Sequence, residues 1–198
     1  MKHILISLAF ALFSPVFVFC QMNELISFEK ERIDLNKKAM VVLGSWSTAN
    51  IIVGAIGTNA NNRVTRYFNQ MNVMWNSVNL LIAGAGYYSA TKENLNDLTI
   101  SKILMHQNKT EKAFLFNTGL DLAYITTGLY LTERSKRNAD PAKLKGYGNS
   151  VMLQGGFLFL LDAVTYKFQQ HRGKQLNKFT ENLTVVAGPG AVTFFYAL

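Results

Sequence analysis

Long segments with at most one charged residue alternate with short charged ones along this chain. Four of them can each supply a spanning helix, near residues 39–58, 68–91, 113–132 and 148–166. The first two contain no Asp, Glu, Lys or Arg, and the other two contain one acid each. A helix rises about 1.5 Å per residue, so about twenty residues cross the hydrocarbon core of a bilayer. The pattern therefore predicts an all-α, polytopic membrane protein built as a four-helix bundle.

The first two spans share a pattern that predicts an internal repeat. Residues 46–57 and 75–86 each place Trp first, Asn four positions later, then three aliphatic residues and then small residues. The second copy follows the first by 29 residues. Because consecutive spans run in opposite directions, the polar half of one helix should lie beside the small half of the other. We expect a pseudo-twofold axis in the membrane plane, with Asn50 corresponding to Asn79.

Residues 1–20 have the features of a secretory signal peptide. A short cationic start precedes an apolar run at residues 4–13, and Cys20 precedes the expected cleavage site. A lipoprotein anchor on Cys20 is one alternative, although the bulky Phe19 stands where that processing favours a small residue. An uncleaved extra membrane helix is another. Residues 21–38 alternate charged and apolar side chains, so we expect an amphipathic helix that leads into the first span.

The C-terminal part, residues 167–198, combines a basic linker with an apolar end. Residues 182–198 carry no charge, but this segment is short and contains Pro189 between two glycines. Proline removes a helical hydrogen bond and therefore argues against an unbroken span. We expect a re-entrant or interfacial segment, and a fifth spanning helix is the alternative.

Basic residues in the connections predict the orientation. The connections 59–66 and 133–145 each follow an odd-numbered span, so both should lie on one side of the membrane. They carry Arg63, Arg66, Arg134, Lys136, Arg137, Lys143 and Lys145. By the positive-inside rule this side is the cytoplasm, and residues 92–112, which we expect to include a short surface helix, lie outside. The prediction is a bacterial inner-membrane protein with its N-terminus outside after signal cleavage.

Composition argues against several classes of function. The formal net charge is +8, but the basic residues lie between hydrophobic segments, which favours membrane ends over nucleic acid. The single Cys leaves with the signal peptide, and His106 and His171 lie in charged segments. These residues do not form a haem or metal set, and no nucleophile or phosphate-binding motif occurs. We therefore expect no cofactor, no metal, no nucleic-acid partner and no enzymatic activity.

Polar residues inside the expected spans are the candidate functional residues. Four asparagines of the second span follow one another at steps of three and four, which places them on one face of a helix. The candidates for a polar interior are Asn50, Asn69, Asn72, Asn76, Asn79, Asn117, Asp121 and Asp162. Two interpretations stay open. The amides either hydrogen bond between helices at ~0.6 kcal/mol each, with Asn76 as the clearest case, or line a polar pathway.

The two acids, Asp121 and Asp162, favour the pathway. A carboxylate within hydrocarbon costs on the order of 3 kcal/mol, so both should face the interior. The four spans contain no Lys, Arg or His to neutralise them. Asp121 lies nearest the middle of its span and is the better candidate for a site that titrates or attracts a cation. Asp162 lies near the end of its span, where it can reach water.

Two segments carry a resemblance to a known family. They are residues 67–76, with the sequence YFNQMNVMWN, and residues 146–156, with the sequence GYGNSVMLQGG. Together with the signal peptide and the Asn-rich spans, they resemble uncharacterised small bacterial membrane proteins classed as a domain of unknown function. The resemblance covers most of the mature chain. It implies a four-helix membrane architecture and supplies no activity.

The sequence thus predicts an integral membrane helical bundle that is a non-enzymatic scaffold or accessory protein of the bacterial envelope. The expected partner is the lipid bilayer, with a second copy of the chain or another membrane protein as a further partner. The alternative is a small transporter or channel with an Asn- and Asp-lined path. The two functions differ in whether the folded bundle contains a polar cavity that reaches Asp121.

Overall fold

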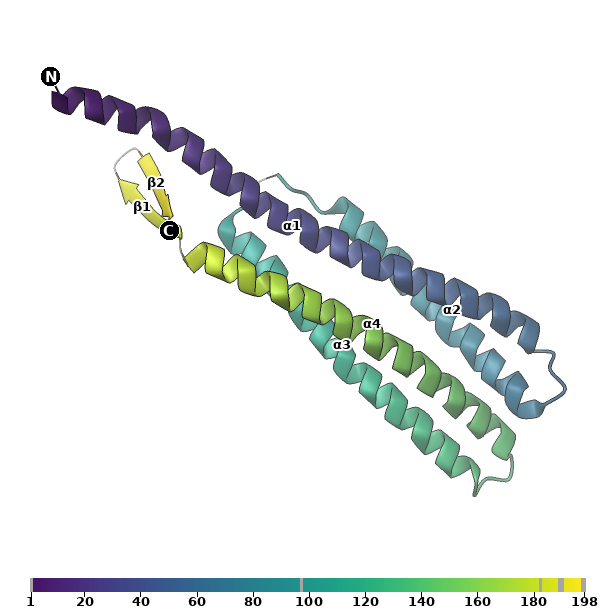
Figure 1. The fold of residues 1–198 in the computed structure, drawn as a ribbon. Helices are drawn as coiled ribbons and strands as arrows, with labels where there is room; N and C mark the ends of the chain where they lie inside the picture. Colours follow the sequence, from purple (N-terminus) through teal and green to yellow (C-terminus); the bar gives the residue numbers. More distant parts are fainter. Residues whose placement is uncertain (1, 97, 182, 189–190, 197–198) are drawn as a thin grey trace.

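The computed structural model describes residues 2–96, 98–181, 183–188 and 191–196, with the side chains of residues 23–96 and 98–181 (Figure 1). Within this part, the helices are α1 (Lys2–Gly57), α2 (Arg63–Lys92), α3 (Ile100–Ser135) and α4 (Pro141–Glu181), followed by strands β1 (Leu183–Gly188) and β2 (Ala191–Tyr196). The expected four-helix architecture is therefore confirmed for the body of the chain.

The apolar C-terminal end departs from the all-α expectation. β1 and β2 pair antiparallel, with Leu183 opposite Tyr196 and Gly188 opposite Ala191. The alternative of a fifth helix is wrong, because the segment forms a hairpin. Its sequence is rich in Val, Thr and Phe, which favour extended backbone. Association of this segment with a membrane stays a prediction.

The helices are longer than the predicted spans, because much of the chain between the spans is also helical. α1 continues from the expected signal peptide through residues 21–38 into the first span. The short surface helix expected within residues 92–112 is the first part of α3. Pro141 opens α4, at a position where proline has no helical hydrogen bond to lose. Cleavage of residues 1–20 stays a prediction, and their side chains lie outside the described ones.

Side-chain caps fix where two of the helices begin. The side-chain oxygen of Asn62 accepts hydrogen bonds from the backbone N–H groups of Val64 and Thr65, at 2.9 and 3.2 Å. The Thr99 hydroxyl accepts from the N–H of Lys102 at 3.3 Å. Each cap satisfies amide groups that a helix start leaves without partners.

The helices form two antiparallel pairs, α1 with α2 and α3 with α4, and the pairs meet mainly where α2 and α1 contact α4 (Figure 1). The α1–α2 and α3–α4 connections lie at one end of the bundle, where Arg63 donates a 2.7 Å hydrogen bond to Asp140. The α2–α3 connection lies at the other end. The Cα atoms of α2 and α3 nowhere come within 8 Å of each other. The bundle therefore has an open seam between these two helices.

The interior of the bundle is polar. Among the described side chains, fifteen polar or charged ones are buried, compared with eleven hydrophobic ones. The apolar part of the core consists of two small clusters, one around Leu43, Ala83 and Leu158 and one around Leu25 and Ile103. A water-soluble bundle buries mainly apolar residues, so this distribution is unusual for a soluble domain.

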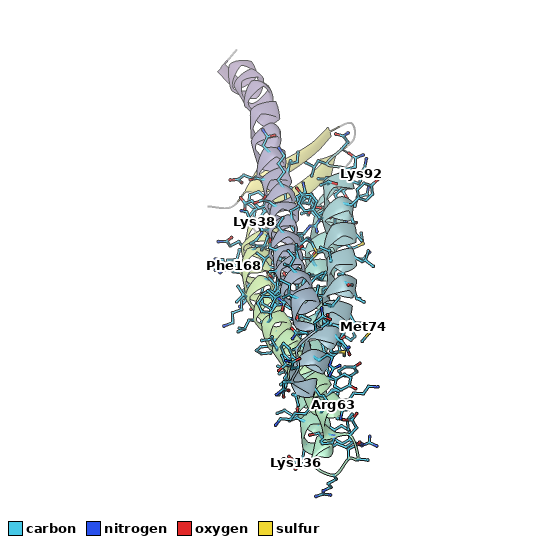
Figure 2. All side chains as sticks on the ribbon, turned by 90° about the vertical axis from the view of Figure 1, so that its right-hand side faces the viewer. Lys38, Arg63, Met74, Lys92, Lys136 and Phe168 are labelled. Carbon is cyan, nitrogen blue, oxygen red and sulfur yellow. The ribbon has the colours of Figure 1, made fainter. Side chains whose placement is uncertain are left out.

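The outer surface of the same bundle is apolar. Large hydrophobic side chains are exposed on all four helices, including Val53 on α1, Leu81 on α2, Phe116 on α3 and Leu160 on α4. In Figure 2 the exposed Met74 lies between Lys92 towards one end and Arg63 towards the other. Among the residues whose side chains are described, two helical stretches are long and apolar enough to cross a membrane: Asn23–Gly57 and Pro141–Glu181.

Candidate functional site

Asn72 is the centre of a hydrogen-bond network that joins three helices. It lies on α2 and is 3 % exposed. Its side-chain nitrogen donates to the Asn50 oxygen of α1 at 2.9 Å. Its side-chain oxygen accepts from the amide of Gln154 and, at 3.4 Å, from the hydroxyl of Ser150, both on α4. This network connects α2 to both of its neighbours in the bundle.

An aromatic pair secures the same network from the side of α1. The Trp46 ring nitrogen donates to the Gln154 side-chain oxygen at 2.8 Å, and its ring stacks on Phe157 with centroids 4.0 Å apart. Gln154 is fully buried, so both ends of its amide need partners, and Trp46 and Asn72 supply them. These residues therefore act as structural hydrogen-bonding groups between helices.

The other asparagines of the α2 stripe behave differently from Asn72. The amides of Asn69 and Asn76 donate to carbonyls of their own helix, each at 2.8 Å. Asn76 is fully buried, and its side-chain oxygen has no hydrogen-bond partner among the described residues. The expectation that Asn76 is the clearest interhelical amide is therefore replaced by Asn72, because only Asn72 faces polar groups of both α1 and α4.

A cavity of about 510 Å³ lies next to this network. Its lining comes from all four helices and is mostly apolar, with nine aliphatic side chains and three aromatic ones. The polar residues in its wall are Asn79, Asn117, Asp121 and Asp162. The stripe on α2 therefore divides: Asn72 belongs to the network, and Asn79 at the far end of the stripe faces the cavity.

Asp121 and Asp162 meet in the wall of this cavity. They come from α3 and α4, are 3 % and 9 % exposed, and their carboxyl groups are hydrogen bonded to each other. One oxygen of Asp121 and the side-chain nitrogen of Asn79 have no hydrogen-bond partner among the described residues. The residues that line the cavity include no Lys, Arg or His. The pair is a buried acidic group without a basic partner.

Aromatic side chains reach across the open seam at the level of the acids. Trp75 of α2 and Tyr124 of α3 meet edge to face, with ring centroids 4.9 Å apart and an interplanar angle of 84°. Both rings line the cavity. Asn117, which we expected in the interior, is exposed, because α2 does not close over this part of α3. The seam is thus bridged by side chains where the backbones stay apart.

Sequence reasoning missed a second polar cluster, centred on Arg32 of α1. Arg32 is 4 % exposed and makes two hydrogen bonds to Glu29, at 2.8 and 3.0 Å. It also contacts Glu93, and donates to the Thr110 hydroxyl at 3.0 Å. His106 lies 2.6 Å from the Glu29 carboxylate. The spacing of Glu29 and Arg32 on one helix was visible in the sequence, but their partners lie more than sixty positions away.

The surroundings of Glu29 keep it ionised. Burial raises the pKa of its carboxyl, but hydrogen bonds and opposite charge from Arg32 and His106 outweigh burial and hold that pKa below its ordinary value. Glu29, Glu93 and His106 offer ligand-type atoms within 4.8 Å of one another, which is a spacing that a metal ion could use. Arg32 already occupies both carboxylates, so the cluster is satisfied as an ion-pair network without a metal.

Comparison with known proteins identifies a family for most of this bundle. The model of DUF6992, a family of unknown function, matches residues 42–163. This range contains the Asn72 network and every cavity-lining residue except Met40, and it excludes Glu29 and Arg32. No curated protein and no solved structure matches the chain.

Proposed function

The chain belongs to DUF6992, and we propose that it is an integral membrane helical bundle that acts as a non-enzymatic scaffold or accessory protein of the bacterial envelope. The observation that carries the proposal is the reversed distribution of side chains, with amides and acids inside and large hydrophobic groups outside. Exposed apolar surface of this extent is costly in water and favourable in lipid.

The reversed distribution of side chains also accounts for α2 and α3, the two helices that mean hydropathy alone does not select as membrane-spanning. α2 has no charged residue between residues 67 and 91, yet its average hydropathy is low because it carries the Asn stripe. Asn69, Asn72, Asn76 and Asn79 are all buried, whereas Leu81 of the same helix is 74 % exposed. A helix with its polar face inward presents mainly apolar groups to lipid, so a low average hydropathy is compatible with a spanning helix.

The charged ends of the bundle support an inner-membrane orientation. The two basic connections lie together at one end of the bundle, which is the arrangement that four antiparallel spans require (Figure 1). By the positive-inside rule this end is cytoplasmic, and the α2–α3 connection and the N-terminus are outside.

Cysteine labelling in intact cells tests this orientation. In a chain with Cys20 replaced by Ser, the variants Asn61→Cys and Ala139→Cys should be protected from an impermeant thiol reagent. Asn96→Cys, in the opposite connection, should be labelled and serves as the matched control. Labelling of both Asn61→Cys and Ala139→Cys would reject the orientation.

The packing of α1 on α2 supports the internal repeat. A Cβ atom on Gly57 would lie 2.2 Å from the Asn69 amide nitrogen, and one on Gly86 would lie 2.5 Å from the Met40 sulfur. Gly86 follows Gly57 by 29 residues, and Asn69 follows Met40 by the same number. The approach of Gly57 to Asn69 therefore corresponds to that of Gly86 to Met40, as a twofold axis between two antiparallel helices requires. We propose that the two helices are copies of one design related by a pseudo-twofold axis.

A small transporter is the second candidate, and the cavity favours it. The cavity reaches Asp121, and its two acids have no Ser, Cys, His or Lys beside them in the lining with which to form a catalytic set. Its lining is mainly apolar, which fits a ligand that enters from lipid better than a water-filled channel. Flux of a ligand across proteoliposomes, lost in Asp121→Asn, would favour the transporter; binding without flux would favour the accessory protein.

A further inference from the structure

We propose that the cavity between α2 and α3 binds a lipophilic organic cation, with the Asp121–Asp162 pair as its counter-ion; this rests on the proposed membrane location of the bundle. The inference combines three properties of one site: a buried acidic pair without a basic partner, an apolar wall and aromatic rings beside the acids.

The charge of the site selects a cation. A hydrogen bond between two carboxyl groups requires a proton on one of them, which leaves the other free to carry one negative charge. Within the described part of the chain, no basic side chain lines the cavity to balance that charge. One oxygen of Asp121 has no hydrogen-bond partner among the side chains that the structure describes, although the residue is almost completely buried. A buried carboxylate without a partner is costly, and a bound cation removes that cost.

The remaining wall selects an organic cation over a metal ion. A divalent metal prefers several oxygen ligands, whereas this cavity is lined mainly by aliphatic side chains. Its volume of about 510 Å³ falls in the range of sites that bury a small organic molecule. The rings of Trp75 and Tyr124 line the same space and can attract a cation through their π faces. The hydrocarbon substituents of an organic cation therefore have an apolar surface to contact. Its charge can interact both with the acidic pair and with the aromatic rings.

The open seam provides the route of entry. Met74 and Val78 of α2 and Leu120 of α3 line the cavity and are also exposed on the outside of the bundle. The Cα atoms of α2 and α3 stay more than 8 Å apart along their whole length. In a membrane this side faces the acyl chains, so a ligand dissolved in the bilayer can enter without crossing water.

Titration calorimetry with the purified full chain in maltoside micelles tests the proposal. The cationic probe is tetraphenylphosphonium, and the neutral probe of similar shape is triphenylphosphine oxide. We expect saturable binding of the cation and at least about tenfold weaker binding of the neutral probe. The double variant Asp121→Asn/Asp162→Asn should weaken cation binding at least about tenfold. The matched control is Asp140→Asn, which removes an acid at the end of the bundle and should bind as the wild type does.

A fluorescence measurement keeps the test decisive if the double variant does not fold. The chain has two Trp residues, and only Trp75 lines the cavity. The cation should change the fluorescence of the wild type and of Trp46→Phe, and the change should be lost in Trp75→Phe. Equal binding of both probes, unchanged binding by a folded double variant, or a fluorescence change that follows Trp46 would overturn the inference.

The result can be separated from the membrane proposal. Binding is measured on the purified protein, whereas the location is measured by labelling in cells. Cation binding together with failed labelling would reject the membrane orientation alone. Correct labelling together with equal binding of the neutral probe would reject the ligand class alone, and would identify the cavity as a site for uncharged acyl chains.

Discussion

Replacing Asn72 by Leu should destabilise the bundle more than the same change one helical turn away. Leu has the same number and branching of side-chain heavy atoms as Asn, so the main effect is the loss of hydrogen bonds from the amide. Three interhelical bonds disappear: one to Asn50, one from Gln154 and one from Ser150. At ~0.6 kcal/mol for an average hydrogen bond between membrane helices, the sum is about 2 kcal/mol.

Asn76→Leu is the matched control. Asn76 lies on the same face of α2 and is equally buried, but its amide bonds to a carbonyl of its own helix. Its side-chain oxygen has no partner among the described residues, so replacement removes an unsatisfied buried group. We expect a change within about 0.5 kcal/mol, or a slight gain in stability.

Reversible unfolding in mixed micelles measures both variants. Titration with a denaturing detergent, followed by helical circular dichroism, gives the free energy of unfolding for each chain. The difference between the variants should be about 2 kcal/mol, with Asn72→Leu the less stable. If Asn76→Leu lost as much stability as Asn72→Leu, burial of amides in general would matter more than the network, and the role given to Asn72 would be incorrect.

Three further predictions concern other parts of the bundle. Asp121→Asn should keep the free energy of unfolding within about 0.5 kcal/mol while weakening cation binding; a large loss of stability without any effect on binding would make Asp121 purely structural. Gly148→Ala should cost about 1 to 3 kcal/mol, because a Cβ atom there would lie 2.6 Å from the Gly128 carbonyl oxygen of α3, whereas Gly156→Ala on the same helix has open space and should be neutral. The pKa of Glu29 is held below its ordinary value of 4.5, so its contribution to stability is present above that pH and is lost as the pH falls through the lowered value. Thermal unfolding of the wild type should therefore shift downward below about pH 4.5, and Glu29→Gln, less stable by about 3 kcal/mol at neutral pH, should lack this component of the shift.

Local patterns in the sequence were sufficient to predict the helices and the polar face of α2. Runs of about twenty residues with at most one charge predicted the central parts of the four helices. The three- and four-residue spacing of asparagines predicted a shared face for Asn69, Asn72, Asn76 and Asn79, and this face is buried. The same information could not show that residues 21–38 and the first span form a single helix, α1, without a break. A charged amphipathic segment and an apolar span read as separate elements, although both are compatible with one long helix.

The features that depend on distant residues were not predictable from one sequence. The network pairs Asn72 with Gln154 across a distance in the chain that periodicity does not encode. The open seam depends on how two helix pairs meet, and the exposure of Asn117 follows from that seam. The cluster of Arg32 with Glu93 and His106 needs the middle of α1, the residue that follows α2 and the first turns of α3 to come together.

The accessibility of a spin label at Leu81 in liposomes tests the membrane bundle most directly. Leu81 is 74 % exposed and lies in the uncharged stretch 67–91 of α2, a helix that mean hydropathy alone does not select. In a chain with Cys20 replaced by Ser, a label on Leu81→Cys should relax strongly with oxygen, which dissolves in lipid, and weakly with a water-soluble nickel chelate. A label on Asn61→Cys, in the connection between α1 and α2, should show the reverse. Strong relaxation of the Leu81→Cys label by the nickel chelate would place α2 in water and contradict the account.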